Sequence, residues 1–277
     1  MTMWFDETFE DRVRLGFRVE SYVYRSKSEF QAIDIFDTQP FGRTLALDSV
    51  YQTSVQDEYF YHEMLVHPAL IGAPSIRKVL VIGGGDGGSV REVLRYPEVQ
   101  QCTMVELDRQ VVKACQDHLE EMNVPWDDPR LTLRFEDGNS FIANNQEKYD
   151  VIVVDGPDPV GPAEVLYTSK FYAACRDHLN PEGVFTAQVE APQLMAAEFA
   201  RIVKTLRAEF PMAVPYFGPV PLYVCGSWSY CYATLGQPVY EPNEERVAHI
   251  EPHSRYWNLD IQRAAFAQSN HVRRLLG

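Results

Sequence analysis

A glycine-rich loop with a carboxylate inside it is the first feature of this sequence that could do chemistry. Residues 83–88 read Gly-Gly-Gly-Asp-Gly-Gly and directly follow the apolar run 79–82. Glycine lets a turn adopt positive φ and lets a ligand lie against bare backbone. Glu106 ends the next apolar run, twenty-one residues after Gly85, where an acid can accept hydrogen bonds from ribose hydroxyls. This combination predicts a binding site for a ligand that contains adenosine.

The acid inside the loop narrows the choice of adenosine ligand. Gly83, Gly85 and Gly88 formally satisfy the pattern G-x-G-x-x-G, so a nicotinamide dinucleotide is compatible with the spacing. The pyrophosphate of a dinucleotide would lie at the start of the following helix, where Asp86 would repel it. A carboxylate at this place attracts a cation instead. The sequence therefore favours a sulfonium nucleoside such as S-adenosylmethionine or a relative.

Two carboxylates three residues apart follow the fourth apolar run. Asp155 and Asp158 enclose Gly-Pro in a stiff loop, and Gln188 and Glu190 follow the fifth run. An Asx-type turn would explain the pair structurally, whereas a general base beside a cation anchor would explain it chemically. We favour the chemical interpretation, because the carboxyl ends of parallel strands share one edge of a sheet. That edge would gather six acids and should bind a cationic substrate: Asp86, Glu106, Asp137, Asp155, Asp158 and Glu190.

Other catalytic motifs are absent from the sequence. His62 and His67 resemble the zinc-protease pair, but a spacing of five places them ~140° apart on a helix, which predicts packing or hydrogen-bonding roles. The glycine loop lacks the Lys-Ser/Thr of a nucleotide-triphosphate loop. The five cysteines include no C-x-x-C pair and no metal-ligand spacing. We therefore expect no metal in the site.

Strands and helices must alternate to place these residues together. Five short apolar runs predict strands at 79–82, 102–105, 131–135, 151–154 and 184–187. Between and after them we expect helices near 87–95, 108–122, 138–145, 168–178 and 191–209. This alternation predicts a parallel sheet with helices on both faces, and runs with little alternation indicate strands buried on both sides.

The first part of the chain has a different pattern. Residues 30–36 and 43–47 are expected as strands, a helix is expected near 57–70, and 229–234 is expected as a late strand. We predict an α/β fold, in which a Rossmann-like, methyltransferase-type doubly wound sheet carries a small N-terminal β domain. The expected domains are 1–56 and 57–277.

Composition limits the class of partner. The 277 residues have 25 Lys+Arg against 39 Asp+Glu, a net charge of −14, and 45% of them are hydrophobic. A chain of this kind is a folded globular protein, and its charge disfavours nucleic acid and anionic membranes as partners. An odd number of cysteines, the lack of a visible signal peptide and the lack of a long apolar run favour a cytoplasmic location.

Many ordered segments of the chain resemble the polyamine aminopropyltransferases, which include the spermidine synthases. The matching segments are 41–43, 47–48, 57–58, 61–64, 81–88, 91–93, 105–108, 127–130, 161–164, Tyr223, Trp228 and 264–266. The resemblance implies transfer of an aminopropyl group from decarboxylated S-adenosylmethionine, as co-substrate, to a polyamine precursor, usually putrescine. The products would be spermidine and 5′-methylthioadenosine. It also implies that no prosthetic group is present and that the chain forms a homodimer or homotetramer through its N-terminal strands.

The resemblance assigns roles to individual residues. Donor binding falls to Gln31, Gly83, Gly85, Asp86, Glu106, Asp137 and Gly138. Amine binding falls to Gln52, Tyr61, His62, Asp86, Asp158, Gln188 and Tyr223, with Trp4, Glu190 and Trp228 as further contributors. Our hypothesis is that Asp155, aided by Tyr61, accepts a proton from the attacking amine.

Three departures from the family pattern affect the acceptor. Gly156 and Pro157 replace a Ser/Cys-Ser/Thr pair, Val224-Cys225-Gly226 replaces a more usual sequence after Tyr223, and Gln262 stands where histidine is common. Agmatine, cadaverine or spermidine therefore remain alternatives to putrescine. An S-adenosylmethionine-dependent N-methyltransferase is the competing enzyme class. A polyamine-binding relative without catalysis is the non-enzyme alternative.

Overall fold

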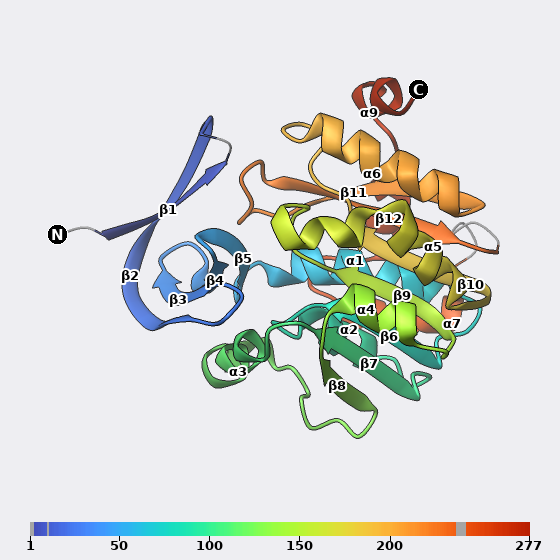
Figure 1. The fold of residues 1–277 in the computed structure, drawn as a ribbon, viewed down its shortest axis with the longest axis horizontal. Helices are drawn as coiled ribbons and strands as arrows, with labels where there is room; N and C mark the ends of the chain where they lie inside the picture. Colours follow the sequence, from blue (N-terminus) through green and yellow to red (C-terminus); the bar gives the residue numbers. More distant parts are fainter. Residues whose placement is uncertain (1–2, 10, 237–241) are drawn as a thin grey trace.

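Five antiparallel strands form a small sheet at one end of the molecule. The computed structural model describes residues 3–9, 11–236 and 242–277. The strands lie side by side in chain order: β1 (Met3–Phe9), β2 (Val13–Lys27), β3 (Ala32–Thr38), β4 (Gly42–Leu47) and β5 (Val50–Ser54). Figure 1 shows them in blue beside the rest of the chain. The small N-terminal β domain is confirmed, and its boundary between residues 56 and 57 stays a prediction.

A seven-stranded mixed sheet forms the larger part of the structure, in the order β11-β12-β10-β9-β6-β7-β8. Its strands are β6 (Lys78–Gly83), β7 (Gln101–Glu106), β8 (Leu131–Phe135), β9 (Tyr149–Asp155), β10 (Leu179–Gln188), β11 (Met212–Pro219) and β12 (Ser227–Thr234). Neighbours from β10 to β8 are parallel, whereas β12 is antiparallel to both β10 and β11. The predicted doubly wound, methyltransferase-type sheet is confirmed.

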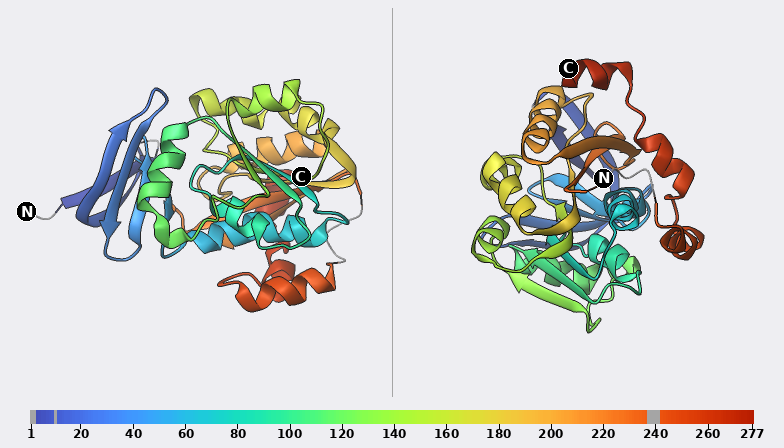
Figure 2. Two further views of the ribbon diagram at one scale, coloured as in Figure 1. Left: turned by 90° about the horizontal axis from the view of Figure 1, so that it is seen from below. Right: turned by 90° about the vertical axis from the view of Figure 1, so that its right-hand side faces the viewer.

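Helices cover both faces of this sheet (Figure 2). One face carries α1 (Glu58–Gly72) and α2 (Gly88–Leu94), with α7 (Glu244–Ile250), the 3-10 helix η3 (Glu251–His253) and α8 (Leu259–Ala265) farther along the chain. The other face carries α4 (Gly138–Asn144), η2 (Gly161–Tyr167), α5 (Ser169–Asp177), α6 (Ala196–Glu209) and α9 (Asn270–Leu276). Each face packs its own apolar core, because strands such as β6 and β9 are buried on both sides.

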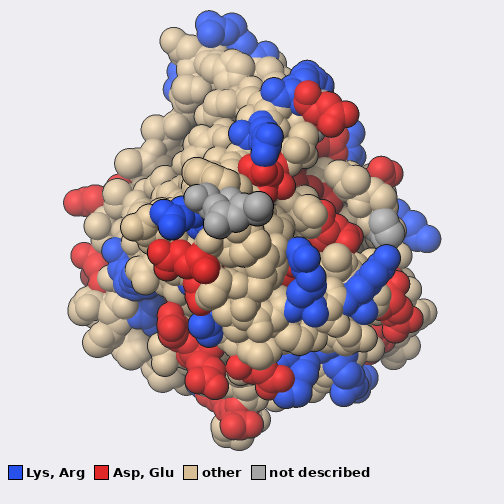
Figure 3. Space-filling view, turned by 90° about the vertical axis from the view of Figure 1, so that its left-hand side faces the viewer, with Lys and Arg blue, Asp and Glu red and all other residues tan. Residues whose placement is uncertain are grey.

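The helix α3 (Arg109–His118) and the short η1 (Glu120–Met122) join the two sheets. Their apolar side chains, including Val111 and Cys115, pack against Ile33 and Ile35 of the N-terminal sheet. This contact fixes the N-terminal sheet over the carboxyl ends of β6 and β7. Figure 3 looks onto this end of the molecule, where basic and acidic side chains lie interspersed around uncharged areas. The charge of −14 therefore does not form a single acidic patch on that face.

Helix α1 is buried almost all round, with twelve of its fifteen residues inside the protein. One side of it presents Tyr61 and His62 toward the sheet edge. The buried carboxylate of Glu63 faces elsewhere and accepts three backbone N–H bonds, from Arg255, Tyr256 and Trp257, at 2.7–2.8 Å. A buried carboxylate is stable only with such partners, so the C-terminal segment is firmly attached to α1.

The structure differs from the sequence prediction at several elements. The region 108–122 divides into α3 and η1, and α6 begins at Ala196 instead of 191. β8 alternates between half-buried and exposed residues, since it is an edge strand and not buried on both faces as predicted. β11 was not predicted, because it contains Pro215 and Pro219, and proline is uncommon inside strands. Proline is tolerated there, because β11 lies at the other edge of the sheet.

Candidate active site

The glycine loop and the Asp155 loop meet where the strand order reverses between β6 and β9. Ligands bind open α/β sheets at this kind of switch point. Gly83 pairs in register with Asp155, and the Gly84 N–H donates to the Asp155 carbonyl at 2.8 Å. Gly83 has φ of +82°, and a Cβ there would lie 2.1 Å from that carbonyl oxygen. Only glycine permits this close approach of the two loops.

Two hydroxyl groups orient the Asp155 carboxylate. The Tyr61 hydroxyl donates to Oδ1 at 2.9 Å, and the Ser89 hydroxyl donates to Oδ2 at 2.6 Å. Burial raises the pKa of Asp155, and the neighbouring Asp86 raises it further, against the lowering effects of His62 and the two hydroxyls. Burial also raises the pKa of Tyr61 well above its usual value, so this phenol remains a donor. Asp155 thus combines a fixed orientation with a raised affinity for protons.

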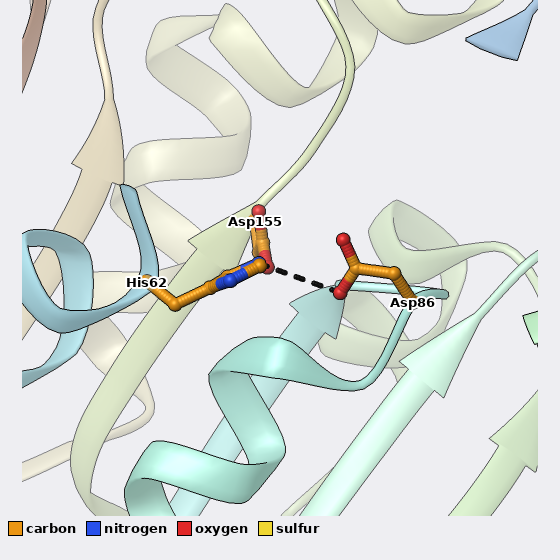
Figure 4. Close-up of side chains that lie close together, drawn as sticks. All are labelled: His62, Asp86 and Asp155. Carbon is orange, nitrogen blue, oxygen red and sulfur yellow. Dashed lines mark ion pairs between the residues drawn. The ribbon is translucent and has the colours of Figure 1, made fainter. Parts of the chain in front are cut away.

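Asp86 lies beside His62 at the start of α2 (Figure 4). Its Oδ1 accepts the Gly88 N–H at 2.8 Å and lies 3.4 Å from His62 Nε2. One polar atom from each of His62, Asp86 and Asp155 lies within 4.8 Å of the others. His62 comes from α1, Asp86 from the glycine loop and Asp155 from β9, so three separate elements build this cluster.

The residues assigned to adenosine line the edge toward β7 and β8. Burial raises the pKa of Glu106 to about 7, while its Oε1 accepts the Asp108 N–H at 2.8 Å. Gln31 reaches over from the N-terminal sheet and donates to Asp108 at 3.1 Å, not to Glu106. Asp137 caps α4 by accepting the Ser140 N–H at 2.7 Å. Gly138 cannot carry a side chain, because a Cβ would lie 2.4 Å from Ile82.

A pocket with about 430 Å³ of empty space lies between the two sheets. Its walls are Glu7, Val50, Tyr51, Gln52, Tyr61, Gly156, Pro157, Asp158, Gln188, Met195, Tyr223, Val224 and Trp228. Six of the residues predicted to bind amine are among them: Gln52, Tyr61, Asp158, Gln188, Tyr223 and Trp228. The rings of Tyr61, Tyr223 and Trp228 follow one another, with centroids 6.0 and 4.8 Å apart. Electron-rich ring faces of this kind favour cationic guests.

The side chain of Gln188 organises the far wall of this pocket. Its oxygen accepts Trp228 Nε1–H at 3.2 Å and the Glu190 N–H at 3.0 Å. Its nitrogen donates to the Tyr167 hydroxyl at 2.6 Å and to Glu190 Oε1 at 3.4 Å. All of these groups are fixed by one amide, so Gln188 orients Trp228 and Glu190 in addition to lining the wall.

The carboxylates at this far end have raised pKa values. Burial raises the pKa of Asp158 to about 6, and burial together with Asp158 raises the pKa of Glu190 well above its usual value. Glu190 adopts φ of +69° behind the wall formed by Gln188. Within the described ranges, neither acid forms an ion pair with Lys, Arg or His. The six acids predicted on one rim therefore divide into separate groups, with Asp86, Glu106 and Asp155 at the loop end.

Two residues of the site were missed by the sequence analysis. Glu7 of β1 lines the pocket near Asp158, which contributes to the raised pKa of Glu7. Trp4, which was assigned to the amine site, is 57% exposed and is not part of the pocket wall. Ser89 is the second missed residue. It follows the glycine loop, and its position beside Asp155 could have been predicted from the pairing of β6 with β9. No comparable local signal points to Glu7.

Comparisons with known proteins agree with this geometry. Residues 58–239 match the spermine/spermidine synthase domain, and residues 3–54 match the spermidine synthase tetramerisation domain. The polyamine aminopropyltransferases of Clostridium perfringens and Desulforudis audaxviator are 37% and 38% identical. These alignments cover 100% and 96% of this chain and 98% and 96% of the relatives.

Solved structures agree equally well. A spermidine synthase in complex with the transition-state analogue AdoDATO superimposes with a TM-score of 0.96 at 34% identity, over 99% of this chain and 95% of the other. The Thermotoga maritima spermidine synthase gives a TM-score of 0.93 at 33% identity, over 99% and 94%. In the part of the chain that the structure describes, no helix is long and apolar enough to cross a membrane.

Proposed function

This chain belongs to the polyamine aminopropyltransferase family, and we propose that it moves the aminopropyl group of decarboxylated S-adenosylmethionine to putrescine. The products are spermidine and 5′-methylthioadenosine. The observation that carries the proposal is a pocket with acids in its wall and further acids directly beside it. Asp158 and Glu7 line the pocket at its far end. Asp155 and Asp86 lie next to its loop end, where the wall residue Tyr61 donates a hydrogen bond to Asp155. A diamine and a sulfonium donor are the cations that such a pocket suits.

The reacting amine must lose a proton before it can attack. An alkylammonium with a pKa near ~10 costs roughly 4 kcal/mol to deprotonate at neutral pH. We assign this proton to Asp155, whose orientation is set by the hydroxyls of Tyr61 and Ser89. The freed nitrogen attacks the methylene carbon next to the sulfonium, a C–N bond forms, and the C–S bond breaks to release a neutral thioether. Positioning the two reactants in line contributes much of the acceleration.

The donor and the second amine need separate anchors. Asp86 keeps Oδ2 available for the ammonium of the donor's aminopropyl group, because its Oδ1 already contacts His62 and Gly88. Glu106 is assigned to the ribose, and Gln31, Gly85, Asp137 and Gly138 to the remaining donor surface. Asp158 binds the distal ammonium of putrescine, with Glu7 and Glu190 behind it. The AdoDATO complex of the relative described above supports an aminopropyl transfer at this site.

A product assay tests the reaction and the acceptor together. Purified protein is incubated with decarboxylated S-adenosylmethionine and, separately, putrescine, agmatine, cadaverine or spermidine, and the products are identified by mass spectrometry. We expect spermidine and methylthioadenosine in equal amounts from putrescine, and less product from the other amines. Faster turnover of another amine would reassign the acceptor. S-adenosylhomocysteine formed from intact S-adenosylmethionine would indicate a methyltransferase, and amine binding without product would indicate a non-catalytic relative.

We also propose that the chain assembles as a homodimer or homotetramer through β1–β5. Its match to the tetramerisation domain supports this, as do the exposed apolar side chains of Met3, Trp4 and Tyr22 on the first two strands. Light scattering at several protein concentrations measures the mass directly. A mass that stays at 31.7 kDa would contradict the assembly.

A further inference from the structure

Both ring nitrogens of His62 face carboxylate oxygens. Nδ1 lies 2.8 Å from Glu58 Oε2, and Nε2 lies 3.4 Å from Asp86 Oδ1. The side chain is 2% exposed, so no bulk water separates these groups. The imidazole also lies flat against the backbone of Gly88, where an added Cβ would be 2.2 Å from the ring. The ring therefore cannot turn away from either carboxylate.

This geometry determines the protonation state of the ring. A neutral imidazole has one N–H and one lone pair, so either tautomer would direct the lone pair at a carboxylate oxygen. Only the imidazolium has an N–H group facing each carboxylate, so that it donates to Glu58 and forms an ion pair with Asp86. The positive end of α2 opposes the charge, but two carboxylates in contact outweigh one helix terminus. Asp155 from β9 adds attraction, and the uncharged ring of Tyr61 packs perpendicular to the imidazole.

Arg91 and its partners hold the Glu58 carboxylate in place. Glu58 is buried on α1, and Arg91 of α2 binds both of its oxygens, at 3.0 Å and 2.7 Å. Arg91 is itself fixed by Glu92 at 2.8 Å and by the carbonyl of Met122 at 2.9 Å. The paired guanidinium keeps Glu58 ionised, and it lowers the pKa of that carboxyl together with His62. Arg91 thus contacts Glu58, Glu58 contacts His62, and His62 contacts Asp86.

We propose that His62 is a permanent imidazolium that serves as the resident counter-ion of Asp86, and that Glu58 and Arg91 are positioning residues that maintain it. The cation keeps Asp86 ionised before the donor arrives, and it contacts Oδ1, which leaves Oδ2 for the ammonium of the donor. A neutral histidine would neither keep Asp86 ionised nor attract its Oδ1 as strongly. The proposal rests on the proposed function only where it names the ammonium of the donor as the group that Asp86 receives.

The protonation state is measured without any turnover. In protein labelled with ¹⁵N-histidine, long-range ¹H–¹⁵N spectra distinguish imidazolium from neutral rings, and His62→Gln identifies the signal of His62 among the seven histidines. We expect an imidazolium pattern that is unchanged from pH 6.5 to 8.5. A neutral ring at pH 7.5, or a titration near the ordinary histidine pKa of about 6.5, would overturn the proposal. This result stands whether or not the chain transfers aminopropyl groups.

Glu58→Gln tests the positioning role. It should turn His62 neutral at pH 7.5 and raise the KM for the donor about tenfold, with little change in the KM for the amine. The increase in the donor KM should become smaller as the pH falls to 6.5, because the His62 ring regains its proton. The donor KM of the wild type should show no such decrease. Glu98→Gln is the matched control, since it removes one carboxylate from the Arg246 pair away from the site.

The outcomes separate the two proposals. A pH-independent defect in Glu58→Gln, or equal rises in both KM values, would overturn the positioning role. Arg91→Lys provides a second variant if Glu58→Gln does not fold: its His62 signal should titrate at lower pH than in the wild type, and an unchanged signal would count against Arg91. If no amine yields methylthioadenosine while His62 is an imidazolium, the proposed function fails and the charge assignment remains.

Discussion

Asp86, beside the loop end of the pocket, and Asp158, at its far end, have the same side chain in opposite electrostatic environments. At the loop end, Asp86 contacts His62 and the Gly88 N–H, and these partners lower its pKa. At the far end, burial raises the pKa of Asp158 to about 6. Burial also raises the pKa values of Glu190 and Glu7. Among the described residues, no cation is paired with Asp158. The same carboxyl group is therefore held ionised at Asp86, whereas at Asp158 it can still take up a proton.

The difference indicates how each end meets its ligand. Asp86 is already ionised and held in place, so no proton has to leave this carboxyl when the ammonium of the donor binds. The far end keeps acids close together without a counter-ion, and a distal ammonium would supply one. Binding of the amine should therefore release protons from Asp158 near its pKa, whereas Asp86 should release none when the donor binds.

Removing the charge of Asp155 should have the largest effect. Asp155→Asn leaves the hydroxyls of Tyr61 and Ser89 in place but provides no base, so turnover should fall by about 10²–10⁴-fold. Affinity for the donor, measured by calorimetry, should change little. A variant with near-normal turnover would show that the proton leaves by another route.

Asp158→Asn should weaken binding of the amine and leave binding of the donor nearly unchanged. The loss of one charged contact should raise the KM for putrescine by roughly 10–100-fold. The KM for the donor should stay within about twofold of the wild type, because the donor contacts lie at the loop end. Steady-state kinetics with each substrate varied separately measures both values. Equal rises in the two KM values would remove the distinction between the ends.

Acidification should weaken the binding of the amine at Asp158. The ammonium binds the ionised form of Asp158, whose pKa is raised to about 6, so putrescine affinity should fall as the pH drops through 6. The fall should approach about tenfold per pH unit below that value. Calorimetry in buffers of different ionisation enthalpy should detect proton release on binding at pH 6. Asp158→Asn should flatten this dependence, and an unchanged profile in that variant would assign it to another group.

Ser89→Ala should have the smallest effect and should act at the loop end alone. Loss of a hydroxyl that donates to Asp155 at 2.6 Å removes one of the groups that lower its pKa. The acid limb of kcat should therefore move upward by about 0.5–1 pH unit, with a few-fold loss of rate at neutral pH. Ser89→Thr retains the hydroxyl and should restore the profile. A downward shift would mean that Ser89 does not stabilise the ionised carboxylate.

The sheet and its loop end followed from local sequence patterns. Short apolar runs such as 79–82 and 151–154 are buried on both faces of the sheet. The residues that follow these runs lie together at the carboxyl edge of the sheet. The approach of Gly83 to Asp155 could therefore be predicted from residues 72 positions apart. β8 was also located correctly, although its place at the edge of the sheet gives it an exposed face that its composition did not reveal.

The far end depended on contacts that no local pattern encodes. Glu7 lies on a strand with no distinctive signal, and it reaches the pocket only because α3 holds the N-terminal sheet over the larger one. The contacts of Arg91 and Glu58 around His62 were missed for a similar reason. The spacing of His62 and His67 argued only against a zinc motif. The approach of Arg91 to Glu58 depends on how α1 packs against α2.

The attachment of Glu63 to the C-terminal segment has a consequence for how the chain matures. Its three N–H donors lie 192 to 194 residues farther along the sequence, so they leave the ribosome long after α1 has been made. Until then, the helix that carries Tyr61 and His62 has a buried acid without partners. Contacts of such separation form late and slow folding. Assembly of the catalytic helix should therefore be among the last events after synthesis, and nascent chains that end before Trp257 should lack a finished site.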